Sequence, residues 1–426
     1  MNANPAASLF LLHTGSNVGY AISPLETLFY ESGLELGGED RGRVHFAFRH
    51  LDGGHPRSVP QDFTNVIAFD FTDTSPGNIE RLAAYVRQHH IRLVLIFDIQ
   101  PIHPLFRPLR QAGVKTILSY HGAQISSYMP AWKLTIKRLQ IATSRSRVDG
   151  LIFESQAMAD CAVYGRGVPQ HMIDIVPLGV DTARFRPDRT DYAYRTLMIP
   201  RDRKIVIYAG HMERRKGVHS LIEAAIELLV KRKRADISFL ICGNKGDESK
   251  EFEQMYAGLG IEDSIRFGGY RDDLAQLYTS CFCGVIPSIG WDSFTYASVE
   301  MAAAGLPVVA SRLQGLPEAV LDGQTGLLFE PGNAKALANC LEVLLDRPEI
   351  AAEFGRRGRQ RCERELNIDV QRQRLLKVVR KHLGRASGRV QLFVGRRGGG
   401  VYRETRRRRG TERVTQSIVR KLRKED

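Results

Sequence analysis

The 426-residue sequence lacks any apolar run long enough to cross a membrane as a helix. Such a helix needs about 18 or more consecutive apolar residues. The first apolar segment, residues 9–12, is short and has no basic residue before it. We therefore expect a buried strand there, and not a secretory signal peptide. Both absences favour a cytoplasmic protein.

Cysteine and acidic patterns typical of metal sites are also missing. None of the six cysteines has the spacing of a metal site, and Cys281 and Cys283 are one residue apart, as in a strand, and do not form a CxxC pair. There is no Asp-x-Asp motif and no cluster of His and Cys. We expect reduced core thiols and a function that requires neither a metal nor another cofactor.

Positive charge is concentrated at the C-terminal end of the chain. Residues 384–426 hold fourteen Arg or Lys and four Asp or Glu, so they supply +10 of the formal net charge of +14 and residues 1–383 supply +4. The tail is rich in Gly and Arg, and we expect most of it to be disordered. It is compatible with a solvated segment and with one held to anionic lipid. Specific nucleic-acid binding would need basic stripes on the folded part, which the small excess there disfavours.

Short apolar segments alternate with helical patterns over the rest of the chain. In the first half, strands are expected at residues 8–12, 44–48, 66–71, 91–97, 114–119 and 150–153. After a polar, loop-like break at 176–187, they are expected at 204–209, 237–242, 264–267, 281–286, 307–310 and 326–329. This alternation predicts α/β structure with parallel sheets covered by helices on both faces.

The length of the chain exceeds one ordinary core and predicts two domains. We expect two Rossmann-like, doubly wound domains that face a cleft, because ligands of such sheets bind at the carboxyl ends of the strands. The predicted parts are a first domain over residues 1–185, a second over 186–365, a C-terminal helix over 366–383 that crosses back to the first domain, and the basic tail over 384–426.

The densest group of residues that could carry chemistry lies at 287–311, after an expected buried strand. A helix is expected to begin near Phe294, and its free N–H groups and dipole would suit a phosphate. Glu300 would lie close enough to that end to accept two hydroxyls of a ribose. A single acidic residue at a helix start is usually a helix cap or a surface charge. Neither role explains the whole group of residues at 287–311.

Two further loops follow expected strands. Residues 210–217 form a basic turn in which Lys216 can place a charge on a diphosphate; a solvated loop is the alternative. In the first half, Gly15 and Gly19 would let the backbone approach a ligand or simply serve a tight turn. His121 follows the strand expected at 114–119, where a structural role is the alternative to a catalytic one.

The segment 287–311 resembles family 4 of the retaining glycosyltransferases, also called glycosyl transferases group 1. Members carry Glu-x7-Glu after a Pro-Ser strand end, followed by Glu-Ala-(Met/Leu)-Ala-x-Gly-x-Pro-Val. Asp292 and Glu300 have this spacing, and residues 301–309 follow the family pattern closely. Residues 315–318 and 322–329 look like the Gly-x-Pro-Glu and Gly-x-Thr-Gly passage of the family. The resemblance runs from about residue 14 to 383 and is more specific in the second half.

This resemblance implies a GT-B fold, with an acceptor-side first domain and a nucleotide-sugar-binding second domain. It implies transfer of a hexose from a UDP- or GDP-type sugar to a glycan or lipid-linked acceptor, in cell-envelope or exopolysaccharide biosynthesis, with retention of configuration and without a metal. The implied catalytic residues are His121, Lys216 and Asp292. The donor-binding residues expected from the motifs and the resemblance are Gly15, Gly19, His211, Arg215, Phe267, Ser293, Phe294, Thr295 and Glu300.

The chain departs from the family pattern at the sugar-facing positions. Asp292 is one methylene shorter than the usual Glu, and Ser293 and Thr295 replace common glycines. His211 stands where the family usually carries an Arg, and it lacks the permanent charge and fork of that side chain. Arg214 or Arg215 could compensate. These departures predict an altered donor-sugar pocket within a retained fold.

The sequence leaves several functions open. Asp292 is the one obvious candidate for a nucleophile, and the resemblance implies that it contacts donor hydroxyls instead. We therefore favour front-face attack, in which the departing phosphate oxygen takes the acceptor proton. The alternatives are another GT-B activity, a non-catalytic family member, or a nucleic-acid-binding protein that acts through its Arg-rich tail.

A basic segment at 130–147 bears on the acceptor. Its apolar residues recur at helical spacing, with basic residues among them: Trp132, Ile136, Leu139 and Thr143, with Lys133, Lys137, Arg138, Arg145 and Arg147. A helix packed on the core accounts for this slightly better than a helix lying on an anionic membrane. The second interpretation, with the tail, predicts a peripheral protein at the inner face of the plasma membrane.

Overall fold

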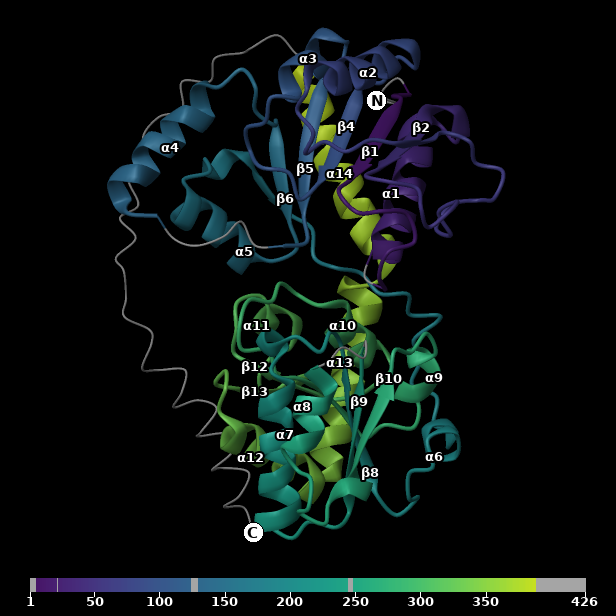
Figure 1. Ribbon diagram of the computed structural model, residues 1–426, viewed down its shortest axis with the longest axis vertical. Helices are drawn as coiled ribbons and strands as arrows, with labels where there is room; N and C mark the ends of the chain where they lie inside the picture. The colour runs from purple at the N-terminus through teal and green to yellow at the C-terminus, as the bar shows by residue number, and fades with distance from the viewer. Residues whose placement is uncertain (1–4, 21, 124–128, 244–247, 388–426) are drawn as a thin grey trace. The chain divides into compact units, whose positions relative to one another are not determined.

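The computed structural model describes residues 5–20, 22–123, 129–243 and 248–387 (Figure 1). It divides into two compact units. The first contains the described residues up to Pro177 together with Asp369–Ser387, and the second contains Leu178–Ile368. The tail was predicted to begin at residue 384, but helix α14 continues to Ser387, so residues 384–387 belong to the helix. The rest of the predicted tail, residues 388–426, lies outside the described part of the chain.

The first unit is a parallel sheet of seven strands in the order β3-β2-β1-β4-β5-β6-β7 (Figure 1). Leu9 and Leu11 point to one face and Phe10 and Leu12 to the other, so each face of β1 joins a separate apolar core. Helices α2, α3 and α5 cover the first face, and α1 and α14 cover the second. The strands are β1 (Ser8–Leu12), β2 (Val44–Phe48), β3 (Val66–Ala68), β4 (Leu93–Phe97), β5 (Thr116–His121), β6 (Gly150–Phe153) and β7 (Ile173–Ile175). The helices are α1 (Ile22–Gly37), α2 (Pro76–Gln88), α3 (Phe106–Gln111), α4 (Ala131–Thr143), α5 (Gln156–Asp160) and α14 (Ile368–Ser387).

The second unit is a parallel sheet of six strands in the order β10-β9-β8-β11-β12-β13 (Figure 1). Its strands are β8 (Lys204–Ala209), β9 (Ile237–Cys242), β10 (Ile265–Gly269), β11 (Cys283–Ile286), β12 (Val308–Ser311) and β13 (Gly326–Phe329). Its helices are α6 (Tyr192–Thr196), α7 (Val218–Ile226), α8 (Glu248–Gln254), α9 (Leu274–Tyr278), α10 (Tyr296–Ala303), α11 (Leu316–Ala319), α12 (Ala334–Asp346) and α13 (Pro348–Glu365). Val206 and Tyr208 of β8 pack with α7 and α12 in one apolar core.

The predicted fold class of two Rossmann-like parallel-sheet domains is confirmed. Both sheets have the doubly wound order in which the first strand lies between the second and the fourth. Strands β1, β2, β6, β8, β9 and β13 begin and end where the sequence predicts. Strand β7 was not expected. It has three half-buried residues with the polar Asp174 in the middle, so it lacks the apolar run of a buried strand.

Helix α4 has its apolar residues on the outside, so the core-helix interpretation of residues 130–147 is wrong. Trp132, Ile136 and Leu139 are 64%, 60% and 65% exposed. Ile141 is the buried residue of this helix, and at 3.6 residues per turn it lies opposite the exposed stripe. The buried side is held closely to the unit, because Gly167, with a φ of +70°, lets its loop approach the helix backbone at Leu134.

The buried His45 on β2 makes the stability of the first unit depend on pH. Its Nδ1 lies 2.8 Å from the Tyr85 hydroxyl, and its ring centroid lies 4.8 Å from that of His89. Burial, followed by the charge of His89, lowers the pKa of His45 to about 4. The unfolded chain, with a His pKa of about 6.5, therefore takes up this proton first as the pH falls.

The free energy of unfolding is therefore expected to fall as pH decreases from about 6.5 towards 4, with about 2–3 kcal/mol lost to His45 between pH 7 and 4.5. Urea titrations at the two pH values measure the change. A His45→Phe variant should lose this part of the pH dependence, and the exposed His50→Gln control should keep it. Equal pH dependence of wild type and His45→Phe would contradict the assignment.

Candidate active site

The site in the second unit lies where the strand order of its sheet reverses. Strand β8 pairs with β9 on one side and with β11 on the other. The loops that follow β8 and β11 are therefore neighbours at the carboxyl edge of the sheet, although β9 and β10 separate them in sequence. Ligands of open α/β sheets bind at such a switch point. Strand β12 adjoins β11 and brings its own loop to the same edge.

Lys216 and Asp292 meet at this switch point. Lys216 ends the turn after β8, and its Nζ lies 2.8 Å from Oδ2 of Asp292 in the loop after β11. The two side chains are 16% and 4% exposed. The Ser288 hydroxyl donates to the same carboxylate oxygen over 2.6 Å, and the Ser293 N–H donates to Oδ1 over 3.2 Å. The structure thus joins two predicted catalytic residues in one partly buried ion pair.

Gly217 allows the two loops to approach. It has a φ of +73°, and a Cβ at this position would lie 1.9 Å from the carbonyl oxygen of Pro287. The N–H groups of Ile289 and Gly290 donate to the Arg215 carbonyl over 2.8 and 3.0 Å. A side chain at 217 would therefore push the lysine turn away from the loop that carries Asp292.

Helix α10 begins at Tyr296, two residues later than predicted, because Thr295 is its N-cap. The Thr295 hydroxyl accepts from the Ser298 N–H over 3.3 Å. The backbone of Thr295 has a φ of +58°, which suits glycine better than threonine. Ser293 and Phe294 are buried just before the helix. Glu300 lies four residues after Tyr296 and is 3% exposed, so its carboxylate is enclosed beside the first turn of the helix.

The remaining residues predicted to bind the donor lie on loops, apart from Phe267, which lies within a strand. His211 is exposed in the turn after β8, and its carbonyl oxygen accepts from the Tyr208 hydroxyl over 2.6 Å. The Arg215 guanidinium lies 4.1 Å from the ring centroid of Trp291 and pairs with Glu213 over 2.6 Å. Arg215 is therefore already engaged, which limits its ability to replace the missing family arginine. Phe267 is half-buried on β10, at the shift in register of that strand against β9.

His121 has a network of its own at the end of β5 in the first unit. It is 2% exposed and stacks on Phe153, with 4.9 Å between the ring centroids. Nε2 lies 2.8 Å from the Ser119 hydroxyl, and Nδ1 lies 3.4 Å from a carboxylate oxygen of Asp98. The Ser119 hydroxyl donates to the carbonyl of Ile99, so it is available to accept from Nε2–H. The two partners hold the imidazole ring of His121 in one orientation, as a catalytic or ligand-binding histidine requires.

The loop after β1 holds Gly15 and Gly19 in different surroundings. A Cβ at Gly15 would meet the His50 ring at 2.3 Å, which indicates a packing requirement. Gly19 has a φ of +81° and open space around it. The side-chain amide of Asn17 donates to the carbonyls of Gly53 and His55 over 2.7 and 2.9 Å, which ties this loop to the one after β2.

Two family descriptions match the chain. Residues 38–184 match "Glycosyltransferase Family 4" and residues 195–361 match "Glycosyl transferases group 1". The chain belongs to the family 4, group 1 glycosyltransferases. The family predicted from the sequence is thereby confirmed.

The D-inositol 3-phosphate glycosyltransferase of Corynebacterium kroppenstedtii is 31% identical to this family 4 chain over 225 residues, which are 51% of the chain and 50% of that protein. The chain therefore spans about half the length of the curated relatives it matches. A glycosyltransferase from Rickettsia africae ESF-5 has a TM-score of 0.75 at 16% identity, with 89% of this chain and 99% of that one covered. Anabaena HepE, in complex with UDP, has a TM-score of 0.71 at 18% identity, with 88% and 99% covered. At these identities, the structural likeness shows the GT-B fold alone.

Four residues that contact the predicted site were not singled out from the sequence of this glycosyltransferase. Asp98 and Ser119 hold His121, Ser288 holds Asp292, and Gln314 accepts from the Asp292 N–H over 2.9 Å. Asp98 directly follows β4, and Ser288 follows β11, so their strand-end positions were a usable signal. Gln314 offered no such signal, because its contact depends on a φ of +44° in the loop after β12.

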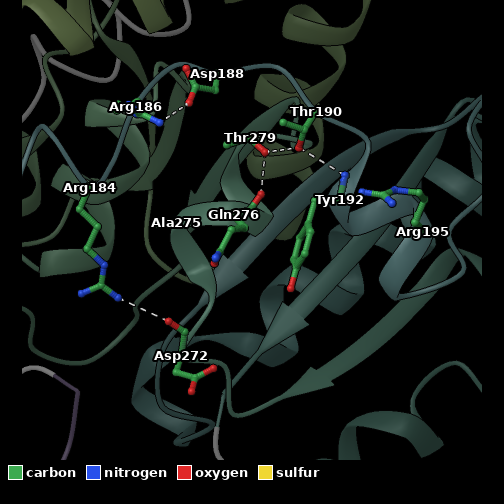
Figure 2. Close-up of a pocket in the computed structure, with 10 residues that line it drawn as sticks. All are labelled: Arg184, Arg186, Asp188, Thr190, Tyr192, Arg195, Asp272, Ala275, Gln276 and Thr279. Atoms are coloured by element: carbon green, nitrogen blue, oxygen red, sulfur yellow. Dashed lines mark hydrogen bonds and ion pairs between the residues drawn. The ribbon is translucent and has the colours of Figure 1, made fainter.

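A separate pocket of the family 4 chain, with a volume of about 470 Å³, lies in the second unit (Figure 2). None of the predicted site residues lines it. Its walls are Arg184, Arg186, Asp188, Thr190, Tyr192, Arg195, Asp272, Ala275, Gln276 and Thr279. Arg186 pairs with Asp188 over 3.1 Å, and Arg195 pairs with Asp191 over 2.8 Å. Because none of the predicted site residues lines this pocket, and Arg186 and Arg195 already have acidic partners, we assign it no part in donor binding.

Proposed function

We propose that this chain is a retaining glycosyltransferase that transfers a hexose from a UDP- or GDP-type sugar to a glycan or lipid-linked acceptor. The observation that carries the proposal is the placement of Lys216, Asp292 and the start of α10 at the switch point of the second sheet. A cation and a helix N-terminus suit a diphosphate, and the enclosed carboxylate of Glu300 suits the hydroxyls of a ribose.

In the proposed reaction, Lys216 and the backbone N–H groups near Ser293 take up the charge that develops on the leaving diphosphate. Such fixed donors act as electrostatic stabilisation of the transition state, and no metal is required for it. The departing phosphate oxygen takes the proton of the acceptor hydroxyl as the new glycosidic bond forms on the same face. His121, oriented by Ser119 and Asp98 in the first unit, is proposed as a third catalytic residue.

The donor can be found by measuring the melting temperature with UDP, GDP, ADP and their glucose or mannose derivatives. We expect one nucleoside diphosphate and its sugars to raise the melting temperature, and UDP is the first choice because Anabaena HepE of the same fold was crystallised with it. No shift with any of these ligands at millimolar concentration would contradict the proposal. The match to D-inositol 3-phosphate glycosyltransferases covers half the chain, so inositol phosphate is one acceptor to assay beside lipid-linked ones.

We further propose that α4 binds the enzyme to an anionic membrane surface at the cytoplasmic face. This location suits a lipid-linked acceptor in cell-envelope or exopolysaccharide synthesis. Trp132, Ile136 and Leu139 form an exposed apolar stripe on this helix. Residues 129–147 hold five Arg or Lys and no Asp or Glu. An apolar stripe beside basic residues, without acidic ones, fits anionic lipid. Among the described residues, no helix is long and apolar enough to cross a bilayer.

Replacing Trp132, Ile136 and Leu139 together with Gln is expected to reduce binding to vesicles of phosphatidylglycerol and phosphatidylcholine by at least about tenfold. Because the three side chains are exposed, the melting temperature should change little. Co-sedimentation measures the binding, and Val230→Gln with Leu259→Gln is the matched control, since both residues are exposed elsewhere. Unchanged binding of the triple variant would contradict the membrane role of α4.

A further inference from the structure

The carboxylate of Asp292 is directed at the protein's own groups. Oδ2 accepts from Lys216 Nζ over 2.8 Å and from the Ser288 hydroxyl over 2.6 Å. Oδ1 accepts from the N–H of the adjacent Ser293 over 3.2 Å. These contacts hold the carboxylate in place, and only 4% of the Asp292 side chain is exposed.

The backbone of this loop is fixed as well. The Asp292 N–H donates to Gln314 over 2.9 Å, and the carbonyl of Ser288 accepts from the Ser311 hydroxyl over 2.6 Å. A side chain as short as Asp, on a backbone held at both points, has little freedom to turn towards a sugar. In this position, the carboxylate of Asp292 lies within hydrogen-bond distance of Lys216 Nζ.

We propose that Asp292 is the resident counterion of Lys216, which the donor diphosphate displaces, and that it positions the lysine instead of binding the sugar. This inference rests on the proposed function, because it assumes that Lys216 receives the diphosphate. In the empty site, Asp292 neutralises the ammonium and holds it at the switch point. On binding, the diphosphate competes with the carboxylate for the same cation, and the two anions repel each other.

The counterion role and a sugar-binding role predict different effects of charge removal. If Asp292 is the counterion, an Asp292→Asn variant loses a negative charge beside the diphosphate, so it binds UDP and UDP-glucose more tightly by the same factor. If Asp292 binds the sugar, the variant binds UDP-glucose more weakly than wild type does, while UDP binding is not weakened.

Isothermal titration of wild type and Asp292→Asn with UDP and UDP-glucose separates these cases, with the GDP pair used if the wild type prefers GDP. We expect both ligands to bind about fivefold or more tightly to the variant at low salt, with the gain reduced at high salt. The control is Ser288→Ala, which removes a hydrogen bond to the same oxygen but keeps the charge, and it should show no tightening. If Asp292→Asn does not fold, Asp292→Ser carries the same expectation.

Three results would overturn the inference. Unchanged affinity of the variant for both ligands would show that Asp292 does not compete for Lys216. Weaker binding of UDP-glucose alone would make Asp292 a sugar ligand. If wild type binds neither UDP, GDP nor their sugars, the proposed function fails together with the inference, whereas the first two results leave the proposed function intact.

Discussion

Replacing Lys216 with Met is expected to lower kcat for donor turnover by about 10²- to 10³-fold, the usual effect of removing one fixed donor that stabilises developing charge. Lys216 lies at the switch point, with its Nζ 2.8 Å from Oδ2 of Asp292. The nearby Arg215 is engaged with Trp291 and Glu213, so it should replace the lost charge poorly. The release of nucleoside diphosphate, followed by chromatography in the presence of EDTA, measures the effect.

Lys335→Met is the matched control for this substitution. Lys335 is exposed on α12, so its loss should leave both stability and turnover close to wild type. The Lys216→Met variant also leaves Asp292 without its cation in a nearly buried position, and its melting temperature should be measured alongside. A folded Lys216→Met variant that turns over donor at the wild-type rate would contradict the assignment of Lys216.

Replacing Glu300 with Gln is expected to weaken the binding of the free nucleoside diphosphate by about 10- to 100-fold. Hydrogen bonds to a charged partner contribute about 1.5–3 kcal/mol, and the amide can accept through one atom only. The carboxylate is 3% exposed beside the first turn of α10, where a ribose would meet it in the proposed site. Titration with the nucleotide that binds wild type measures the loss.

Glu349→Gln, an exposed change on α13, is the control for Glu300→Gln. The expected loss for Glu300→Gln is the same for the nucleotide and the nucleotide sugar, because the ribose is common to both. A loss restricted to the nucleotide sugar would place Glu300 at the sugar and not at the ribose.

Strands with continuous apolar runs were predictable in this chain because burial on both faces of a parallel sheet requires such runs. This explains why the bounds of β8 and β9 agree with the prediction. Strand ends with polar residues were harder to place. The strand β5 extends to His121, beyond the predicted end at residue 119, because backbone pairing to Phe153 continues past the apolar run.

Helix α4 shows the main weakness of periodicity as a guide. The spacing of Trp132, Ile136 and Leu139 correctly indicated one apolar face, but spacing alone does not say whether that face is covered. The contacts of the opposite face, around Ile141 and Gly167, decided the orientation. Those contacts come from segments distant in the sequence, so they could not be inferred from the helix itself.

The site was predictable in its location and less so in its contacts. Lys216 and Asp292 could be placed at neighbouring strand ends from topology, but their direct pairing depends on the close approach that Gly217 permits. Thr295 is a threonine in a backbone conformation that favours glycine, which agrees with a family glycine at that position. The replacement of this glycine by Thr295 could be recognised from the sequence. The hydrogen bond from the Ser298 N–H to the Thr295 hydroxyl, which caps α10, could be seen only in the structure.

Whether the switch point of the second sheet is the donor site can be tested by donor turnover. Wild type, Glu300→Gln and Lys216→Met are each assayed with the nucleotide sugar that raises the melting temperature. We expect wild type to release nucleoside diphosphate, faster with acceptor present, and the sugar to appear in the product with the configuration it had in the donor. At donor concentrations below the wild-type KM, both variants should fall well below wild type while remaining folded. Absence of release by wild type with every nucleotide sugar and acceptor supplied, or equal release by wild type and both variants, would contradict this assignment of the donor site.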